Sequence, residues 1–267
     1  MSLHDDLGIR MKTFYEQIPK TKLMRRTPVA IRIDGKAFHT FTRGFKKPFD
    51  EVLIKSMQQT MKYLCENIQG CVLGYTQSDE ITLILVDYKK LNSSAWFDYE
   101  VQKMCSIAAS MATMAFNRYF EENWQNTYPL HSINNENAEL VNAYITASDK
   151  GAMFDARVFN IPKEEVTNLI YWRQLDATRN SIQMVGQANF SHKELQDKSC
   201  NEIQDMLMVQ KGINWNDFPV NQKRGSCCIK ETYEQDDTTR TRWVIDNNIP
   251  IFREEGREYI DKLITFE

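Results

Sequence analysis

Two carboxylates in this chain of 267 residues have neighbours that could support phosphoryl or nucleotidyl transfer. Asp34 ends an alternating apolar stretch and precedes Gly35, and Asp79 lies in the polar segment Gln77-Ser78-Asp79-Glu80 between two apolar runs. Magnesium prefers oxygen ligands such as carboxylates, backbone carbonyls and phosphates, and a pair of ions can stabilise an in-line displacement. Each dipeptide by itself is weak support, because Asp-Gly and Asp-Glu are also ordinary turn sequences.

The residues that follow Asp34 could bind a triphosphate. The carbonyl of Gly35 can serve as a metal ligand because no side chain blocks close approach. The chain then enters a short turn or helix start at Lys36-Ala37-Phe38-His39, where backbone N–H groups could bind phosphate as helix N-termini do. Lys47, just before Pro48, is a candidate cation for phosphate charge.

Basic residues are concentrated near this segment, although the formal net charge of the chain is −3. A local basic surface can bind phosphate in an acidic protein, because attraction decays over about 10 Å at ordinary salt. The alternative is a solvated basic face, the commoner origin of a charge run. Against the single acid Asp34, residues 20–47 contain Lys20, Lys22, Arg25, Arg26, Arg32, Lys36, Arg43, Lys46 and Lys47.

Composition excludes several classes of protein. With 42% hydrophobic and 26% charged residues, the chain is of ordinary globular type. No stretch approaches the roughly 18 consecutive apolar residues of a membrane span. The acidic N-terminus lacks the apolar core of a signal peptide. We therefore expect a soluble cytoplasmic protein with no membrane partner. Six cysteines without a C-x-x-C pair, and only four histidines, disfavour a zinc site. We expect the cysteines to be reduced and mostly buried.

Hydrophobic periodicity predicts the elements that position the two carboxylates. Alternation indicates strands, and apolar residues three or four apart indicate helices. Residues 121–151 are polar and weakly periodic, so they are predicted to be an irregular insertion. The other predicted elements are a helix at 5–19, a strand at 29–34, a helix at 50–67, strands at 71–76 and 81–86, a helix at 95–120 and a strand at 153–159.

This β-α-β-β-α-β order predicts an α+β fold: a ferredoxin-like palm of the polymerase or cyclase type, with added helices and a small C-terminal α/β extension. In that fold the third strand lies between the first two and runs antiparallel to both, which brings Asp34 and Asp79 to one rim of the sheet. Residues 1–160 would form the palm with its N-terminal helix. Residues 161–267 would be a mainly helical part, with strands near 225–233 and 240–246 and a helix near 254–264. We expect one compact unit, because no linker separates the two parts.

Several motifs that occur in order along the chain are, taken together, more specific evidence of function than any single dipeptide. The chain resembles the tRNA-histidine guanylyltransferase family over about 190 residues. The resemblance rests on Arg32-Ile33-Asp34-Gly35-Lys36-Ala37-Phe38-His39, Lys47-Pro48, Gly74-Tyr75-Thr76-Gln77-Ser78-Asp79-Glu80, Phe154-Asp155-Ala156-Arg157, Trp172-Arg173-Gln174 with Asp176, and Lys223-Arg224-Gly225.

The resemblance implies an enzyme that adds nucleotides to the 5′ end of tRNA in the 3′-to-5′ direction. ATP or GTP would activate a 5′-monophosphate on the acceptor stem, and the 3′-hydroxyl of an incoming nucleotide would attack it. Asp34, the Gly35 carbonyl and Asp79 resemble the ligands of two Mg²⁺ ions, and the segment from Asp34 to His39, with Ser78, resembles the nucleotide site. Arg32 and Lys47 match phosphate-contacting positions. The family also tends to form homotetramers.

Glu80 is the third candidate catalytic carboxylate. It could tune the metals or accept a proton, or it could be a solvated turn carboxylate.

The departures from the family pattern concern specificity. Eukaryotic members carry His-Ile-Asn-Asn after the Trp-Arg-Gln motif, whereas this chain has Thr178-Arg179-Asn180-Ser181. That resembles the bacterial, archaeal and phage-type proteins that repair truncated tRNA 5′ ends by template-dependent polymerisation. Phe49 replaces an expected asparagine, which puts one triphosphate contact in doubt. The alternatives are addition of the extra 5′ G to histidine tRNA, nucleotide cyclisation, and an inactive RNA-binding module.

Candidate tRNA contacts lie in the C-terminal part. For Arg173, Arg179 and Asn180, which fall in one predicted helix, the choice is between tRNA phosphate contacts and a surface stabilised by pairs such as Arg173–Asp176. We favour the surface pair for Arg173, and for Asn180 we favour neither alternative. Lys223 and Arg224 could meet RNA phosphate or be an ordinary exposed basic pair. For Tyr171 and Trp172 the choice is between core and a base-stacking platform, and we favour core. The methionines at helical spacing are also predicted to be core: Met57, Met61, Met104, Met111 and Met114.

Overall fold

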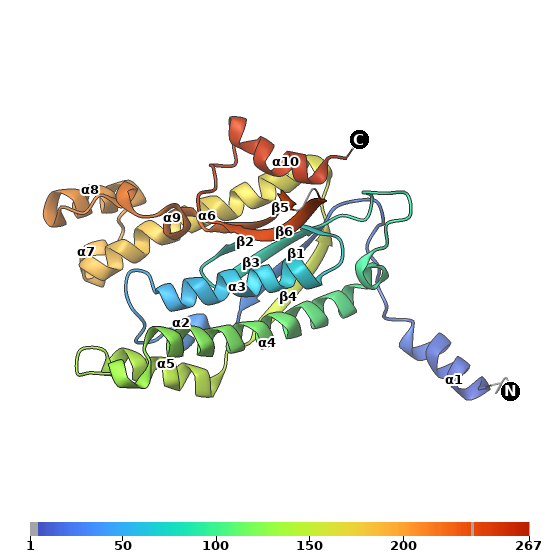
Figure 1. Ribbon diagram of the computed structural model, residues 1–267, viewed down its shortest axis with the longest axis horizontal. Helices are drawn as coiled ribbons and strands as arrows, with labels where there is room; N and C mark the ends of the chain where they lie inside the picture. The colour runs from blue at the N-terminus through green and yellow to red at the C-terminus, as the bar shows by residue number, and fades with distance from the viewer. Residues whose placement is uncertain (1–4, 236–237, 267) are drawn as a thin grey trace.

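The computed structural model describes residues 5–235 and 238–266, and its centre is one antiparallel sheet (Figure 1). The order across this six-stranded sheet is β4-β1-β3-β2-β5-β6. The first four residues, part of the segment expected to lack a signal peptide, lie outside the described residues. The strands are β1 (Val29–Gly35), β2 (Cys71–Gln77), β3 (Glu80–Leu85), β4 (Phe154–Asn160), β5 (Ser226–Gln235) and β6 (Thr238–Asp246).

The predicted placement of the third strand is confirmed. β3 lies between β1 and β2 and pairs with both in antiparallel register. On the other side of β1, strand β4 pairs Asp155 with Asp34 and Arg157 with Arg32. Because alternate residues of a strand point to the same face, Arg32, Asp34, Asp155 and Arg157 share one face of the sheet.

Helices α3 (Glu51–Asn67) and α4 (Val101–Thr127) cover the opposite face, and α5 (Ala138–Lys150) packs against α4 (Figure 1). Helix α3 begins where Asp50 accepts a hydrogen bond from the N–H of Leu53, an N-cap that satisfies one free donor of the first turn. Its buried Met57, Met61 and Leu64 pack on the apolar side chains that β1 and β3 send to this face. Burial of each large apolar side chain stabilises the packing of the two layers by about 1.5–3 kcal/mol.

Helices α6 (Val166–Asn189) and α10 (Glu258–Ile264) cover part of the face that carries Asp34. Val166 and Ile170 of α6 are fully buried against Ala30, Tyr75 and Ile84 of the sheet. Gln174 fixes the C-terminal segment to this helix, because its side chain donates to the carbonyl of Pro250 and accepts from the N–H of Phe252.

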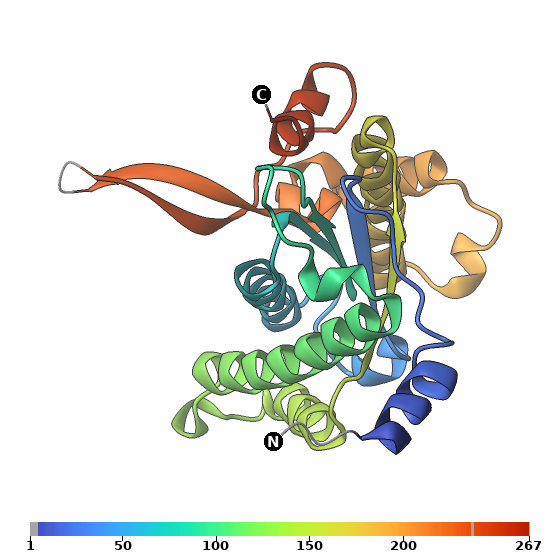
Figure 2. The same cartoon turned by 90° about the vertical axis from the view of Figure 1, so that its right-hand side faces the viewer.

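The C-terminal part extends the sheet and adds a small helical group. The predicted strands near 225–233 and 240–246 are confirmed as β5 and β6, and β5 pairs with β2. Their far ends form a hairpin that projects from the body (Figure 2). A separate apolar cluster joins the end of α6 to the helices beyond it. The remaining helices are α1 (Asp6–Met11), α2 (Phe38–Phe41), α7 (His192–Leu195), α8 (Cys200–Lys211) and α9 (Val220–Arg224).

Two helical predictions were wrong. The helix expected at 95–120 is shifted, because a short 3₁₀ turn occupies Trp96–Tyr99 and α4 runs from Val101 to Thr127. Residues 121–151 are not an irregular insertion, since they contain the end of α4 and all of α5. Helix α5 is fixed by contacts with distant residues: the Tyr144 hydroxyl donates to Asp50 at 2.7 Å, and the Trp124 indole donates to Ser148.

Two residues predicted to be core are exposed. Met114 of α4 is 52% exposed, and Trp172 of α6 is 51% exposed. The prediction of mostly buried cysteines is confirmed for four of the six, and among the described residues none is in a disulfide. Among the described residues, no helix is long and apolar enough to cross a membrane.

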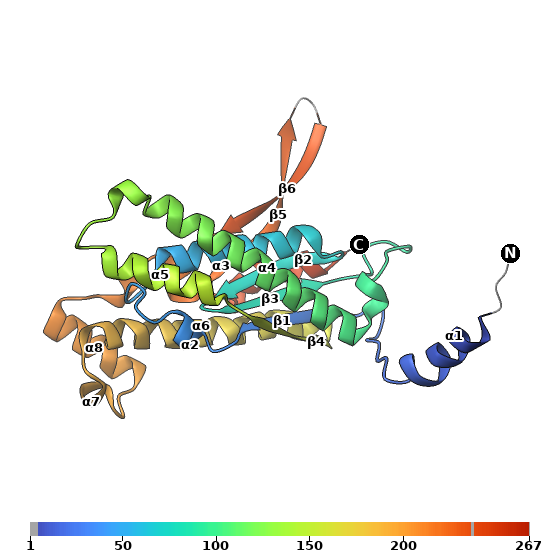
Figure 3. The ribbon, with the colours of Figure 1, turned by 90° about the horizontal axis from the view of Figure 1, so that it is seen from below.

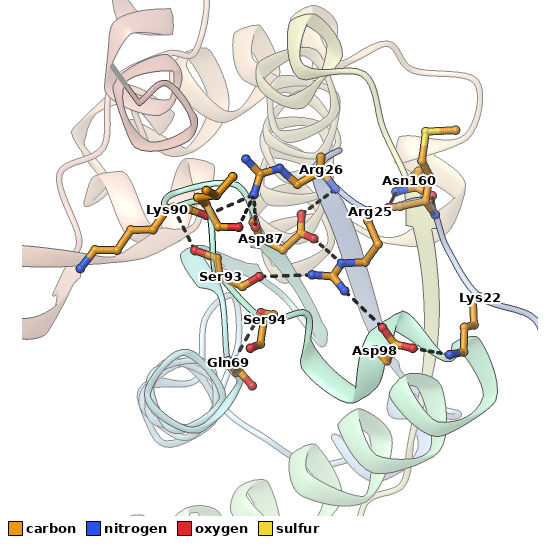
Figure 4. Close-up of polar contacts among 12 residues, drawn as sticks. Lys22, Arg25, Arg26, Gln69, Asp87, Lys90, Ser93, Ser94, Asp98 and Asn160 are labelled. Atoms are coloured by element: carbon orange, nitrogen blue, oxygen red, sulfur yellow. Dashed lines mark hydrogen bonds and ion pairs between the residues drawn. The ribbon is translucent and has the colours of Figure 1, made fainter.

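A polar network ties the N-terminal segment to the far end of the sheet (Figure 4). The buried carboxylate of Asp87 accepts from the Arg25 side chain at 2.5 Å and from the backbone N–H of Arg26 at 2.8 Å. Lys22 and Arg25 also pair with Asp98. Beyond this anchor, α1 and the π-helical turn Lys12–Glu16 extend away from the body without buried side chains (Figure 3). This segment replaces the single helix predicted at 5–19.

Candidate active site

Asp34 and Asp79 come together at one rim of the sheet, as predicted. Asp34 is paired across the strands with Glu80, and the N–H of Gly35 donates to the carbonyl of Asp79 at 3.1 Å. The connection between β2 and β3 is a two-residue turn, Ser78-Asp79, shorter than the four polar residues expected. Ser78 has a φ of 50°, and its hydroxyl donates to the Asp79 carboxylate at 2.9 Å.

The electrostatics of these two carboxyls favour a cation. Partial burial, and then the charges of Glu80 and Asp155, raises the pKa of Asp34, which Arg157 and Arg32 oppose. Burial also raises the pKa of Asp79; the Ser78 hydrogen bond opposes this shift, and the charges of Asp34 and Glu80 add to it. Carboxylates that repel each other at a rim are stabilised by a divalent cation between them.

The donor set fits magnesium better than a transition metal. Among the described residues, no group of three or more His, Cys, Asp or Glu side chains is arranged to hold a metal ion. Mg²⁺ needs no such cage, since it is commonly bound through one or two carboxylates, waters and substrate phosphates. Asp34, Asp79 and the carbonyl of Gly35 would hold it here.

A hollow of about 510 Å³ lies beside the carboxylates and could receive a nucleotide. The side chain of Lys47 is exposed at its edge, where it could approach phosphate. The residues that line it are Gly35, Ala37, Phe38, His39, Thr42, Phe45, Lys46, Lys47, Pro48, Asp50, Leu53, Ser78, Asp79 and Met184. All the predicted nucleotide-binding residues line it except Asp34 and Lys36.

The segment after Gly35 is shaped by the packing of Phe38. A Cβ atom on Gly35 would lie 2.2 Å from the Phe38 ring, so glycine is required here for close packing. Phe38 is buried against Phe41, Phe116 and Phe154. Its backbone, and not its ring, is therefore the part that a nucleotide could reach.

Not every N–H group of this segment is free for phosphate. The N–H of Lys36 already donates to the carbonyl of Met153 at 2.8 Å. Ala37, in the left-handed region with a φ of 54°, is the N-cap residue before the short helix α2 (Phe38–Phe41). The first N–H groups of a helix have no partner within it, so those of Phe38 and His39 remain candidates.

Glu80 is buried and held between two arginines, so it is not a solvated turn carboxylate. One oxygen accepts from Arg173 Nε at 2.7 Å, and the other from an Arg32 terminal nitrogen at 2.8 Å. Arg173 also pairs with Asp176 at 2.9 Å, the predicted i,i+3 contact, but its side chain is buried and not on the helix surface. We call Arg32, Glu80, Arg173 and Asp176 the buried charge network.

One donor of this network is unsatisfied. The Nε–H of Arg32 is buried and has no acceptor among the described residues. A donor left unpaired in this way costs about 1–3 kcal/mol. Arg32 thus faces Glu80 with one nitrogen and retains capacity for a further acceptor.

The other candidate tRNA contacts differ widely in accessibility. The Arg179 side chain is 61% exposed and pairs with Asp176. Lys223 is buried: its ammonium donates to the carbonyl of Asn216 and lies 5.5 Å from the Trp215 ring centroid. Burial, and then the neighbouring Arg224 charge, lowers the pKa of Lys223. Lys223 is therefore not part of an exposed basic pair, and only Arg224, half-buried, remains near the surface.

Asn180 and Phe49 lie next to the candidate active site and not in the hollow itself. Both line a small cavity with Ser78 and Gly225. The ring of Phe49 packs on Phe218 with centroids 5.5 Å apart, so the residue that replaces the expected asparagine joins the C-terminal helical group to the rim.

From the sequence, no role is predicted for Asp155, and Trp172 is predicted to be core. Asp155 lies opposite Asp34 and raises its pKa, and Trp172 is exposed beside Arg32. The alternation of β4 could have indicated Asp155, since it places Asp155 and Arg157 on one face. The exposure of Trp172 depends on how α6 lies on the sheet, which periodicity does not give.

A sheet rim with two carboxylates beside a nucleotide-sized hollow is typical of enzymes that transfer phosphoryl or nucleotidyl groups. The comparisons with known proteins make the class specific. The sequence model described as tRNAHis guanylyltransferase matches residues 9–162, more than half of the chain. This chain therefore belongs to the tRNA(His) guanylyltransferase family of nucleotidyltransferases.

Solved structures of bacterial relatives cover nearly the whole chain. A bacterial tRNA(His) guanylyltransferase-like protein in complex with ATP is 44% identical with a TM-score of 0.81, and it covers 98% of this chain and 100% of its own. One in complex with GTP is 41% identical with a TM-score of 0.76 and the same coverage. The tRNA(His) guanylyltransferase of Schizosaccharomyces pombe is 27% identical, over 83% of this chain and 80% of its own.

Proposed function

We propose that this protein adds nucleotides in the 3′-to-5′ direction to the 5′ end of truncated tRNA, using the opposite strand as template. The observation that carries the proposal is the sheet register. It sets Asp34 beside Glu80 and ties Gly35 to Asp79, at the edge of the hollow described above. ATP and GTP are the proposed substrates, in keeping with the nucleotides bound by the two bacterial relatives.

The protein's own groups would bind and orient the reactants. Asp34, Asp79 and the Gly35 carbonyl would hold two Mg²⁺ ions, and Lys47 with the free N–H groups of α2 would contact the triphosphate. Bound Mg²⁺ would neutralise phosphate charge and favour the attacking and leaving oxygens of an in-line displacement. Glu80 would act by fixing Arg32 and Arg173 behind the metal ligands, because both its oxygens are already occupied.

The reaction would have two displacements. A 5′-phosphate oxygen of the RNA attacks the α-phosphorus of ATP or GTP, and pyrophosphate leaves. The 3′-hydroxyl oxygen of the incoming nucleotide then attacks the activated 5′ phosphorus, and the nucleoside monophosphate leaves. Orientation of the hydroxyl in line with that phosphorus lowers the barrier, and pairing with the opposite strand can supply this orientation.

The second candidate is addition of a single 5′ G to histidine tRNA. Thr178 disfavours it, because its hydroxyl is occupied by the Gln174 carbonyl of the same helix at 3.0 Å and offers no substitute for the missing histidine. The higher identity to the bacterial guanylyltransferase-like proteins than to the yeast enzyme points the same way. An inactive RNA-binding module is disfavoured because both Asp34 and Asp79 are present at the rim.

We further infer that β1–α3–β2–β3–α4–β4 is a ferredoxin-like palm. On this proposal residues 1–160 are the catalytic core and residues 161–267 are packed on it. A homotetramer is also proposed, supported by the side chains of the N-terminal segment, where Leu7, Ile9, Phe14 and Ile18 are each more than half exposed. Light scattering after gel filtration would test the assembly.

The test of function offers one 5′-monophosphorylated truncated tRNA with each opposing base in turn, all four nucleotides and Mg²⁺. We expect the added nucleotide to follow the opposing base on any acceptor stem. Addition of G alone, whatever the opposing base and only on histidine tRNA, would establish the second candidate. No release of pyrophosphate from ATP or GTP with any of these RNAs would leave only the inactive module.

A further inference from the structure

An exposed tryptophan stands beside the candidate active site. Trp172 of α6 is 51% exposed, although large aromatic side chains normally bury most of their surface. The guanidinium carbon of Arg173 lies 4.5 Å from its ring centroid, and that of Arg32 lies 5.3 Å away. Both arginines are held by the buried carboxylate of Glu80. The indole is therefore fixed from the protein side and open toward solvent.

The ring lies near the proposed metal ligands, because it contacts Arg32, which is two residues from Asp34 in β1. Arg32 and Asp34 lie two residues apart on the same face of β1, and a strand rises about 3.3–3.4 Å per residue, so their Cα atoms are separated by about 7 Å. Trp172 contacts Arg32. A nucleotide whose 5′ phosphate reacts at Asp34 would thus carry its base within reach of the indole.

We propose that the open face of Trp172 is a stacking platform for the base of the nucleotide at the 5′ end of the RNA substrate. The inference rests on the proposed function and adds a subsite to it. Aromatic side chains bind the bases of unpaired nucleotides in this way with little dependence on sequence, since every base has a π-face. Such tolerance suits an enzyme whose product end changes base with each addition.

The surroundings of the ring favour an anionic partner. Arg157 lies opposite Arg32 in the sheet with 62% of its side chain exposed, and its pairing with Asp155 is loose at 3.6 Å. Arg32, whose side chain is 20% exposed, adds a second positive charge beside the ring.

The test is a cycle of two protein forms and two RNAs. Wild type and Trp172→Ala are titrated, without nucleotide and at fixed salt, with a 5′-monophosphorylated truncated tRNA and with the same RNA carrying an abasic 5′-terminal residue. Loss of one base–aromatic stack should weaken binding by about tenfold to a hundredfold. We expect that loss for the intact RNA in Trp172→Ala and for the abasic RNA in wild type, with little further loss when both changes are combined.

Two further variants separate stacking from structure. Trp172→Phe keeps a smaller ring and should lose less affinity than Trp172→Ala. Phe97→Ala is the matched control, because Phe97 is also an exposed ring, at 37%, with the Lys103 ammonium 5.2 Å from its centroid, but it precedes α4 on the other side of the sheet. It should bind both RNAs as wild type does.

The outcomes distinguish this inference from the proposed function. If wild type extends the intact RNA but Trp172→Ala binds both RNAs with an equal loss or no loss, the stacking inference is wrong and the proposed function stands. If Trp172→Ala changes the oligomeric mass and not the RNA affinity, the ring belongs to an interface between copies, and the inference is likewise overturned. If wild type neither binds nor extends the intact RNA, the proposed function itself fails.

Discussion

Replacing Arg173 by methionine should destabilise the protein far more than replacing any exposed arginine of the same helix. The Arg173 side chain is 8% exposed and that of its partner Glu80 is 7% exposed, with 2.7 Å between Nε and the carboxylate oxygen. Methionine keeps much of the apolar stem and removes the charge. The buried carboxylate of Glu80 would then face Arg32 alone.

The size of the destabilisation depends on the contacts that Glu80 keeps after Arg173 is replaced. Removing one partner of a buried ion pair costs about 3–5 kcal/mol when the other charge is left uncompensated. Arg32 still contacts the second oxygen of Glu80 at 2.8 Å, so we expect roughly half of that, about 2 kcal/mol. At about 2–4 °C per kcal/mol for a chain of this size, the midpoint of thermal unfolding should fall by about 4–8 °C.

The assay is thermal and urea unfolding of Arg173→Met, with Arg179→Met as its control. Arg179 shares the partner Asp176, but its side chain is 61% exposed. Exposed pairs are worth about 0–1 kcal/mol, so the control should shift the midpoint little. The double variant with Glu80→Gln should be less destabilised than the sum of the two single changes. Strict additivity, or equal shifts for Arg173→Met and Arg179→Met, would show that the buried charge network does not act as we describe.

The remaining predictions concern the rim, the triphosphate and the N-terminal anchor. Asp34→Asn or Asp79→Asn should abolish nucleotide addition while leaving the fold intact by circular dichroism; full activity in either would refute the metal-ligand assignment. Because the pKa of each carboxyl is raised in the folded protein, folding is favoured when these groups are protonated and loses that contribution as pH rises above their ordinary range near 3.8. The melting temperature of Asp34→Asn relative to wild type, without Mg²⁺, should therefore increase from pH 4 to pH 7, and a flat difference would contradict the pKa shift. Lys47→Ala should raise the KM for nucleotide much more than the Kd for tRNA, whereas equal effects would make Lys47 part of a general basic surface. Asp87→Ala leaves the Arg26 N–H and the Arg25 side chain without their acceptor and should lower the free energy of unfolding by about 1–3 kcal/mol, measured with urea; an unchanged midpoint would mean that water replaces the carboxylate.

The sequence predicted the centre of the fold well because that part follows local periodicity. Alternation located β1 and β4, and two β-rich runs located β2 and β3, each to within a residue or two; their order predicted which strands are neighbours. The proximity of Asp34 and Asp79 could be predicted from the positions where two neighbouring strands end and begin. The part of the site that depends on register alone could therefore be predicted from the chain.

What the sequence did not predict depends on contacts between distant residues. Helix α5 lies in a polar, weakly periodic stretch, and its position is fixed by Tyr144 on Asp50 and by the aromatic side chains of α4. The burial of Arg173 and Lys223 could not be predicted either, because both sit in segments that look like ordinary basic surface. Each is buried with a partner that lies in another element or turn of the fold, which is the condition under which a charged side chain can be buried at all.

The buried charge network also supports the proposal that Asp34 and Asp79 bind Mg²⁺. The register places Glu80 directly across from Asp34, and like charges in a cross-strand pair are unfavourable. Glu80 is compensated by two arginines at short distance, and Asp155 is loosely paired with Arg157. Among the described residues, Asp34 and Asp79 form no ion pair, and their pKa values are raised. Glu80 and Asp155 thus have cationic partners, whereas Asp34 and Asp79, of which Asp79 lines the hollow, form no ion pair with any described residue, so we expect a divalent cation bound at the rim to gain the attraction of both.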